Sequence, residues 1–151
     1  QGDFVLFDFG ACLRKYNSDI TRTFVFGKSI ERQREMYQVV LEAQRIGLDM
    51  IKPGVKACMV HNAVESFINK SKFKGRFIHS TGHSLGLAVH DDRIGLNSEC
   101  DVELCENMVF TVEPGVYIPG FGGVRIEDDV LVKKDGFELL TKSSKEFLEI
   151  V

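Results

Sequence analysis

The segment FVLFDFGACLRKYNSDITRTFVF, residues 4–26, contains two runs of β-branched and aromatic residues on either side of a polar stretch. Residues 4–9 and 20–26 have the composition of strands, and the residues between them include turn formers. This pattern predicts a β-hairpin. A hairpin that closes midway between Asp8 and Asp19 places these two carboxylates opposite each other, with Cβ atoms roughly 5 Å apart.

A second pair of carboxylates repeats this arrangement near the C-terminus. Glu113 ends the strand-like run MVFTVE, and Glu127 lies within VRIEDDVLV. The two glutamates are symmetric about Gly120, so a hairpin that turns there also brings them face to face. Directly opposed like charges destabilise a sheet unless solvent or a cation compensates for them.

The residues around these four carboxylates favour cations over solvent. Their runs are apolar enough to be buried, and a buried carboxylate must be paired, protonated or bound to metal. Arg22 and Arg125 are the evident basic partners in the same strands, too few for all four acids. Four carboxylates and one histidine form an oxygen-rich ligand set for two hard cations with shared ligands. Two such cations, about 3.5–4 Å apart, activate a bridging water.

Three of the four histidines lie in one short stretch, HSTGHSLGLAVHDD, residues 79–92. Any one of His79, His83 and His90, taken alone, is explained by a local hydrogen bond in a core or loop. Neutral imidazole is also a metal ligand and a proton carrier near neutral pH. The acidic residues elsewhere in the chain therefore favour a functional role for this stretch.

The rest of the chain predicts one α+β unit. Ser29 is expected to cap a helix with Glu31 in its first turn, and Pro53 and Gly54 end that helix. A second amphipathic helix is expected from Ala57 to Ile68, followed by the histidine stretch and further strands, including FELLT at residues 137–141.

Composition excludes several classes of protein. The 151 residues suffice for one domain, with 44% hydrophobic and 27% charged residues. A net charge of −3 gives no reason to expect nucleic acid or an anionic membrane as partner. No apolar run approaches the ~20 residues of a transmembrane helix, and the first residues lack a secretory signal pattern. Four widely spaced cysteines are typical of reduced thiols, so we expect a cytoplasmic protein.

Four ordered motifs resemble the Xaa-Pro metallopeptidases of the pita-bread fold, a family that includes aminopeptidase P and prolidase. They are DFGACLRKYNSDITRTF (8–24), HSTGHSLGLAVHD (79–91), TVEPGVY (111–117) and GGVRIEDDVLV (122–132). The resemblance extends from about Phe4 to Val132. Val-Arg-Ile-Glu-Asp favours the proline-directed branch over the more distant methionine aminopeptidases.

The resemblance implies a role for individual residues. As metal ligands it implies Asp8, Asp19, His83, Glu113 and Glu127. Asp19 and Glu127 would bridge two ions, and Glu113 would also accept the proton of the attacking water. His90 would hold the scissile peptide, His79 would line the proline side of the pocket, and Arg125 would brace the site. His61 has no counterpart and is expected to be structural or exposed.

The resemblance also implies the architecture and the activity. Residues 1–151 would form a single catalytic domain, the C-terminal part of a pita-bread domain with a curved antiparallel sheet and helices outside. The upstream part of that fold and any N-terminal domain would be missing, so the isolated chain is expected to have little activity and to self-associate. The implied cofactor is two divalent ions, with Mn²⁺ favoured by carboxylate ligands and Co²⁺ or Zn²⁺ as alternatives. The implied partners are a proline-containing peptide and a second copy in a full-length homodimer.

Three alternatives remain open at this point. The substrate is either an Xaa-Pro dipeptide or a longer peptide, because the stretch after His90 is one residue shorter than in many dipeptidases and lacks their proline. This leaves open whether Arg93 reaches a substrate carboxylate. A catalytically silent pita-bread module that binds peptides or proteins, and a metal-free hydrolase of the creatinase type, are disfavoured because all five ligands are present.

Overall fold

The N-terminal hairpin forms in the computed structural model, which describes residues 2–91 and 94–150. Its strands are β1 (Asp3–Phe9), β2 (Cys12–Leu13), β3 (Tyr16–Asn17) and β4 (Ile20–Phe26). The predicted closing point is wrong by one residue. The hairpin turns at Arg14 and Lys15, whose φ angles of 52° and 72° are those of a two-residue turn. Asp8 therefore faces Thr21 and not Asp19.

The second hairpin has the predicted register. Its strands are β7 (Val109–Val112), β8 (Gly115–Ile118), β9 (Gly122–Arg125) and β10 (Asp128–Lys133). Both the inner pair (β8 with β9) and the outer pair (β7 with β10) are symmetric about Gly120, whose φ is 74°. The ladder is interrupted between the two pairs, where Glu113 and Glu127 occupy opposite positions. Pro114 contributes to this break, because proline has no N–H to donate.

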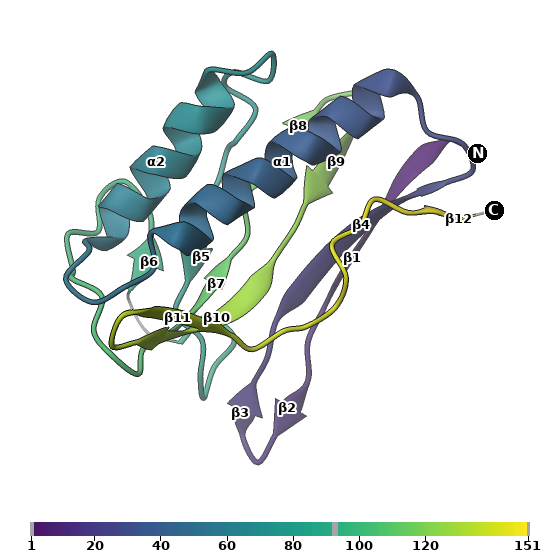
Figure 1. Cartoon of the computed structure of the whole chain (residues 1–151). Coiled ribbons are helices and arrows are strands. Elements are labelled where there is room, and N and C mark those ends of the chain that lie inside the picture. The colour runs from purple at the N-terminus through teal and green to yellow at the C-terminus, as the bar shows by residue number, and fades with distance from the viewer. Residues whose placement is uncertain (1, 92–93, 151) are drawn as a thin grey trace.

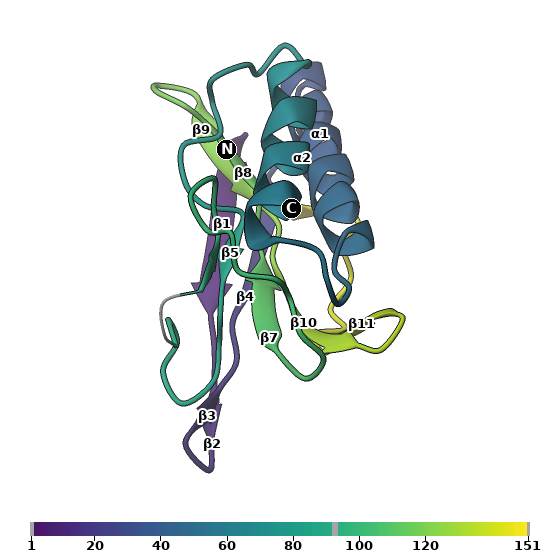
Figure 2. The ribbon, with the colours of Figure 1, turned by 90° about the vertical axis from the view of Figure 1, so that its left-hand side faces the viewer.

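Two helices of the described residues, α1 (Glu31–Asp49) and α2 (Ala57–Asn69), pack against each other on one side of the strands (Figure 1, Figure 2). The predicted helices are confirmed, but the Ser29 cap is wrong. The helix starts after Ile30, whose N–H is bound by the Gln33 side chain at 2.9 Å. The Ser29 hydroxyl instead donates to Glu149 at 2.5 Å, a partner distant in the sequence. Neither helix is both long and apolar enough to span a membrane.

Apolar side chains from the helices and the second hairpin form two buried clusters. The first contains residues of α1 and α2 together with Val116, Val124 and Ile126. The second contains Phe110, Val112, Val130 and Val132 from β7 and β10, packed against the ends of the helices. The helices therefore cover this face of the strands.

Short strands complete the chain. They are β5 (Gly82–His83), β6 (Gly95–Leu96), β11 (Gly136–Leu139) and β12 (Glu149–Ile150). The predicted strand at 137–141 is confirmed as β11, which pairs with β10. The last strand, β12, pairs in parallel with β4, so the C-terminal segment returns to the first hairpin.

A buried charge network fixes this returning segment. Asp128 has no exposed surface, and its carboxylate accepts hydrogen bonds from four side chains. The donors are Arg22 (2.7 Å), Lys145 (2.7 Å), Thr141 (2.7 Å) and Gln44 (2.8 Å). These bonds outweigh the effect of burial and lower the pKa of Asp128. The network joins the first hairpin, α1, β10 and the C-terminal segment.

Asp128→Ala is expected to destabilise the protein by about 3–5 kcal/mol, since it leaves the buried Arg22 and the partly buried Lys145 without their counter-charge. Urea unfolding measures the loss. Asp49→Ala is the matched control, because Asp49 is exposed and lies 3.4 Å from the exposed Arg45. Such surface pairs contribute about 0–1 kcal/mol. Equal losses in the two variants would contradict a structural role for the network.

Candidate metal centre

The break in the second hairpin directs both glutamates toward other strands. The Glu113 N–H donates to the Thr81 carbonyl at 2.7 Å, just before β5, and the Glu127 N–H donates to the Thr21 carbonyl at 3.2 Å in β4. The first hairpin, the histidine stretch and the second hairpin therefore meet where the acidic residues are located.

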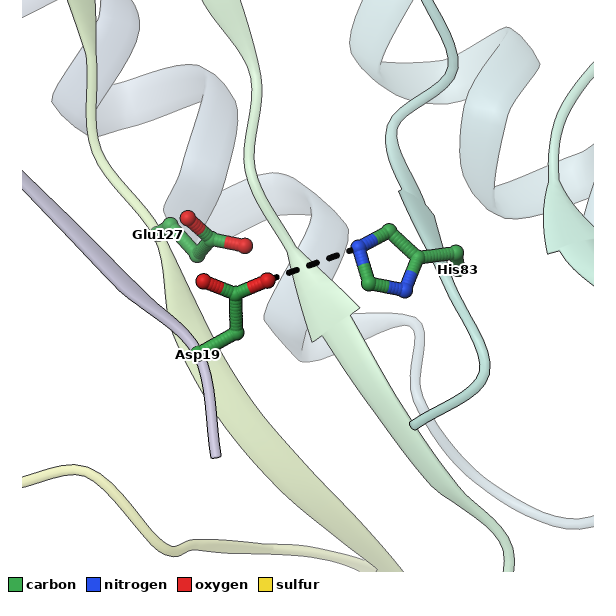
Figure 3. A group of neighbouring side chains, drawn as sticks. All are labelled: Asp19, His83 and Glu127. Atoms are coloured by element: carbon green, nitrogen blue, oxygen red, sulfur yellow. Dashed lines mark ion pairs between the residues drawn. The ribbon is translucent and has the colours of Figure 1, made fainter. Parts of the chain in front are cut away.

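Three of the predicted ligands come together at this meeting point. One ligand atom each from Asp19, His83 and Glu127 lies within 4.8 Å of the others. Figure 3 shows the three side chains pointing toward one another from separate segments, with the His83 Nε2 atom 3.8 Å from Asp19 Oδ2. Glu127 is buried and accepts a short hydrogen bond from the Thr21 hydroxyl.

Glu113 approaches the same nitrogen of the His83 ring as Asp19 does. Its Oε1 atom is 3.4 Å from His83 Nε2 and accepts a hydrogen bond from the Thr111 hydroxyl at 3.0 Å. The other oxygen, Oε2, is 3.8 Å from Arg125 Nε. Glu113 is therefore linked to the group of three predicted ligands through His83.

Asp8 occupies the rim of the same group. Its side chain is 50% exposed and forms an ion pair with Arg125, whose guanidinium also donates to the Thr21 hydroxyl at 3.1 Å. The Arg125 side chain thus contacts the first hairpin and approaches Glu113. The bracing role of Arg125 stays a prediction.

The His83 ring is oriented so that one nitrogen faces the carboxylates. Its Nδ1 lies 3.1 Å from the Ser84 carbonyl, which leaves Nε2 toward Asp19 and Glu113 when Nδ1 carries the proton. Burial lowers the pKa of His83, so the ring is neutral near pH 7. A neutral imidazole with a free Nε2 lone pair is competent to bind a metal ion.

The other two histidines of the stretch border an open cavity beside the cluster. It has a volume of about 540 Å³ and is lined by His79, Ser80, His83, His90, Glu113 and Arg125. The ring centres of His83 and His90 are 4.0 Å apart. All four residues predicted to act on substrate or water line this one cavity. His61 is buried against Thr81, with Nδ1 3.1 Å from its hydroxyl, as expected for a structural residue.

Tyr117 is a site neighbour that the sequence did not single out. Its hydroxyl lies 2.9 Å from His79 Nε2, while His79 Nδ1 lies 2.8 Å from the Ser80 carbonyl. Both ring nitrogens of His79 are thus held, and burial lowers the pKa of His79. The sequence feature that could have identified Tyr117 is its position four residues after Glu113, on the next strand of the hairpin. Arg93, considered above for a substrate carboxylate, lies outside the described residues.

The donor set suits divalent cations. Burial, reinforced by neighbouring carboxylates, raises the pKa of Glu127 to about 8 and that of Glu113 to about 7. Burial and the nearby Asp8 also raise the pKa of Asp19. These crowded carboxylates repel one another, and a cation between them relieves both the repulsion and the loss of solvent. Carboxylate oxygens with one imidazole nitrogen match the ligands of Mn²⁺ and related ions.

The metal-free protein is expected to lose stability as the pH rises from 6.5 to 8. In this window the folded state keeps protons on Glu113, Glu127 and Asp129, whose pKa values are about 7, 8 and 7, while the unfolded state has released them. The lowered histidine pKa values act in the opposite direction below pH 6.5. Urea unfolding in EDTA measures the slope, and Mn²⁺ should reduce it. Stability that is constant or rises across this window would contradict the acidic cluster.

Several proteins similar to this chain are named for a peptidase activity at Xaa-Pro. The chain is 46% identical over 149 residues to the Xaa-Pro dipeptidase of Pyrococcus furiosus, covering 98% of this chain and 42% of that protein. It superposes on an Xaa-Pro dipeptidase from Bacillus anthracis with a TM-score of 0.96 at 45% identity, covering 99% of this chain and 42% of that one. An X-Pro aminopeptidase from Thermotoga maritima gives a TM-score of 0.95 at 38% identity, with coverages of 100% and 42%.

These similarities confirm the predicted α+β fold and the predicted resemblance. The chain spans about two fifths of the length of each of these relatives. The profile of metallopeptidase family M24 matches residues 1–134, nearly the whole chain. The chain belongs to metallopeptidase family M24.

Proposed function

We propose that this chain carries the metal-binding part of a peptidase that hydrolyses the peptide bond before proline. The observation that supports it best is the cavity of about 540 Å³, which is lined by His79, His90 and Arg125 together with the partly buried Glu113 and His83. The relatives named Xaa-Pro dipeptidase and X-Pro aminopeptidase support the specificity. Proline lacks an N–H and has a fixed φ, so a site that accepts it needs its own pocket.

The residues that would hold the metal are Asp8, Asp19, His83, Glu113 and Glu127, and Asp19 and Glu127 would be shared between two ions. When bound, the two divalent ions lower the pKa of a water molecule and stabilise the developing oxyanion. Mn²⁺ is the favoured ion because four of the five ligands are carboxylates, and Co²⁺ and Zn²⁺ compete according to their availability.

The other polar residues of the cavity divide the remaining tasks. Glu113 accepts the proton of the attacking water, a role suited to its raised pKa of about 7. His90, beside His83, holds the scissile peptide. His79, fixed by Tyr117 and Ser80, lines the proline side. Arg125 holds Asp8 at the rim and approaches Glu113.

The setting of the enzyme follows from the same reasoning. We propose a cytoplasmic protein that acts on proline-containing peptides, with no nucleic-acid or membrane partner, and a homodimer in its full-length form. The free thiols of the four cysteines and the net charge of −3 support this setting. Residues 1–151 would be one catalytic domain that needs further chain to complete its pocket.

A metal-dependent cleavage assay tests this proposal. The protein is expressed from its complete gene, stripped with EDTA and assayed with Xaa-Pro dipeptides, Xaa-Pro-Yaa peptides and the matching Xaa-Ala peptides. We expect Mn²⁺ to restore cleavage of the proline substrates alone, and the two proline series to separate dipeptidase from aminopeptidase. Metal-independent cleavage would favour the metal-free hydrolase of the creatinase type, and no cleavage of either series would favour the silent binding module.

A further inference from the structure

We infer that Asp129 is a positioning residue for the metal ligand Asp19. Its Oδ2 atom accepts a hydrogen bond from the Asp19 backbone N–H at 2.9 Å, across a separation of 110 residues. Asp19 directly precedes β4, where the first hairpin resumes its ladder after a break. The N–H of this ligand is therefore held by a side chain and not by a strand carbonyl. This inference rests on the proposed metal site.

The direction of β10 explains why Asp129 is in reach. Successive side chains of a strand alternate between its faces, so Asp129 lies on the same face as Glu127, while Asp128 points to the opposite face. The contacts agree, because Asp128 binds Gln44 and Lys145 on the helix side. The residue just before β10, Glu127, is thus a proposed ligand, and Asp129 in β10 anchors the backbone of a second ligand.

The burial of the Asp129 carboxylate costs stability, although within the part of the chain that the structure describes the carboxylate accepts only one hydrogen bond, from the Asp19 N–H. Asp129 is 2% exposed, and its Oδ1 atom is buried without a hydrogen-bond partner among the described residues. A buried carboxylate with an unsatisfied oxygen lowers stability, so packing alone does not explain the residue. Asp19 would bridge two ions, and a site of this kind requires its ligands to be held within about 0.5 Å. The bond from Asp129 fixes the backbone from which the Asp19 carboxylate extends.

The surroundings of Asp129 permit a clean substitution. Its side chain borders a cavity of about 410 Å³, lined mainly by apolar residues and by Asn17 and Ser18. Asp129→Asn keeps the shape and an acceptor for the Asp19 N–H, whereas Asp129→Ala removes the acceptor. Val130→Ala is the matched control, since Val130 is the next residue of β10 and is buried in the second apolar cluster. Val130→Ala is expected to lower the stability of the protein, but it changes no contact with Asp19.

The test is Mn²⁺ titration by calorimetry on the protein from its complete gene, combined with hydrogen exchange of the Asp19 amide in the metal-free state. Asp129→Ala should weaken Mn²⁺ binding about 10–100-fold and speed exchange of that amide. Asp129→Asn and Val130→Ala should stay within about 3-fold of the parent in affinity.

The other possible results show whether the inference about Asp129 fails alone or together with the proposed function. Parent-like binding and exchange in Asp129→Ala contradict this inference and leave the proposed function intact. An equal loss of affinity in Val130→Ala also contradicts it, because the effect then follows stability. A parent protein that takes up no Mn²⁺ contradicts the proposed function and the inference together.

Discussion

Glu113→Gln is expected to lower kcat/KM for an Xaa-Pro peptide by at least about 10²–10⁴-fold while the protein stays folded. In the parent, Glu113 Oε1 lies 3.4 Å from His83 Nε2. The glutamine keeps a neutral oxygen at this position, but it cannot accept a proton from water. It also removes one negative charge from the ligand set, which adds to the loss. The fold should survive because the substitution preserves shape and an acceptor for Thr111.

Steady-state kinetics with saturating Mn²⁺ measures this effect, and circular dichroism checks the fold. Glu106→Gln provides the control, as it makes the same chemical change at an exposed position. An activity of Glu113→Gln within a few-fold of the parent would exclude Glu113 as both ligand and proton acceptor.

His83→Ala and His90→Ala are expected to fail in different ways, although their rings are only 4.0 Å apart. His83 faces Asp19 and Glu113 through Nε2, so its loss removes a ligand and should empty at least one metal position. His90 lines the cavity, and its loss should leave the metal content unchanged and lower mainly kcat. That pattern is typical of an interaction made in the transition state.

Elemental analysis after dialysis against Mn²⁺ distinguishes the two variants, and kinetics follows on the loaded proteins. Each variant serves as the other's control, because both remove one imidazole from the same cavity. A fully loaded His83→Ala together with an empty His90→Ala would reverse the assignment of ligand and substrate residue.

Periodicity and symmetry in the sequence predicted the elements that depend on local pattern. Both helices and the strands of the two hairpins form where expected, and the symmetry about Gly120 located the register that opposes Glu113 and Glu127. The first hairpin was harder to place. Its turn uses Arg14 and Lys15 in the left-handed region, where no glycine or asparagine marks the centre.

Contacts between distant segments could not be predicted from the sequence. Ser29 carries the signature of a helix cap, yet its hydroxyl binds Glu149, which β12 brings beside the start of α1. Asp128 and Asp129 are adjacent residues of the same type, so the sequence does not distinguish them. In the fold, the Asp128 carboxylate is fully paired, whereas the Asp129 carboxylate holds the Asp19 backbone. The pairing of Asp8 with Arg125 likewise depends on the approach of the two hairpins.

Anomalous diffraction at the manganese edge, on crystals of the protein from its complete gene grown with Mn²⁺, tests the proposed two-ion site most directly. We expect two peaks roughly 3.5–4 Å apart, both in contact with Asp19 and Glu127, with His83 and Glu113 beside one and Asp8 beside the other. A single peak away from Glu127, or no peak between Asp19 and His83, would contradict a two-metal site built from these five residues.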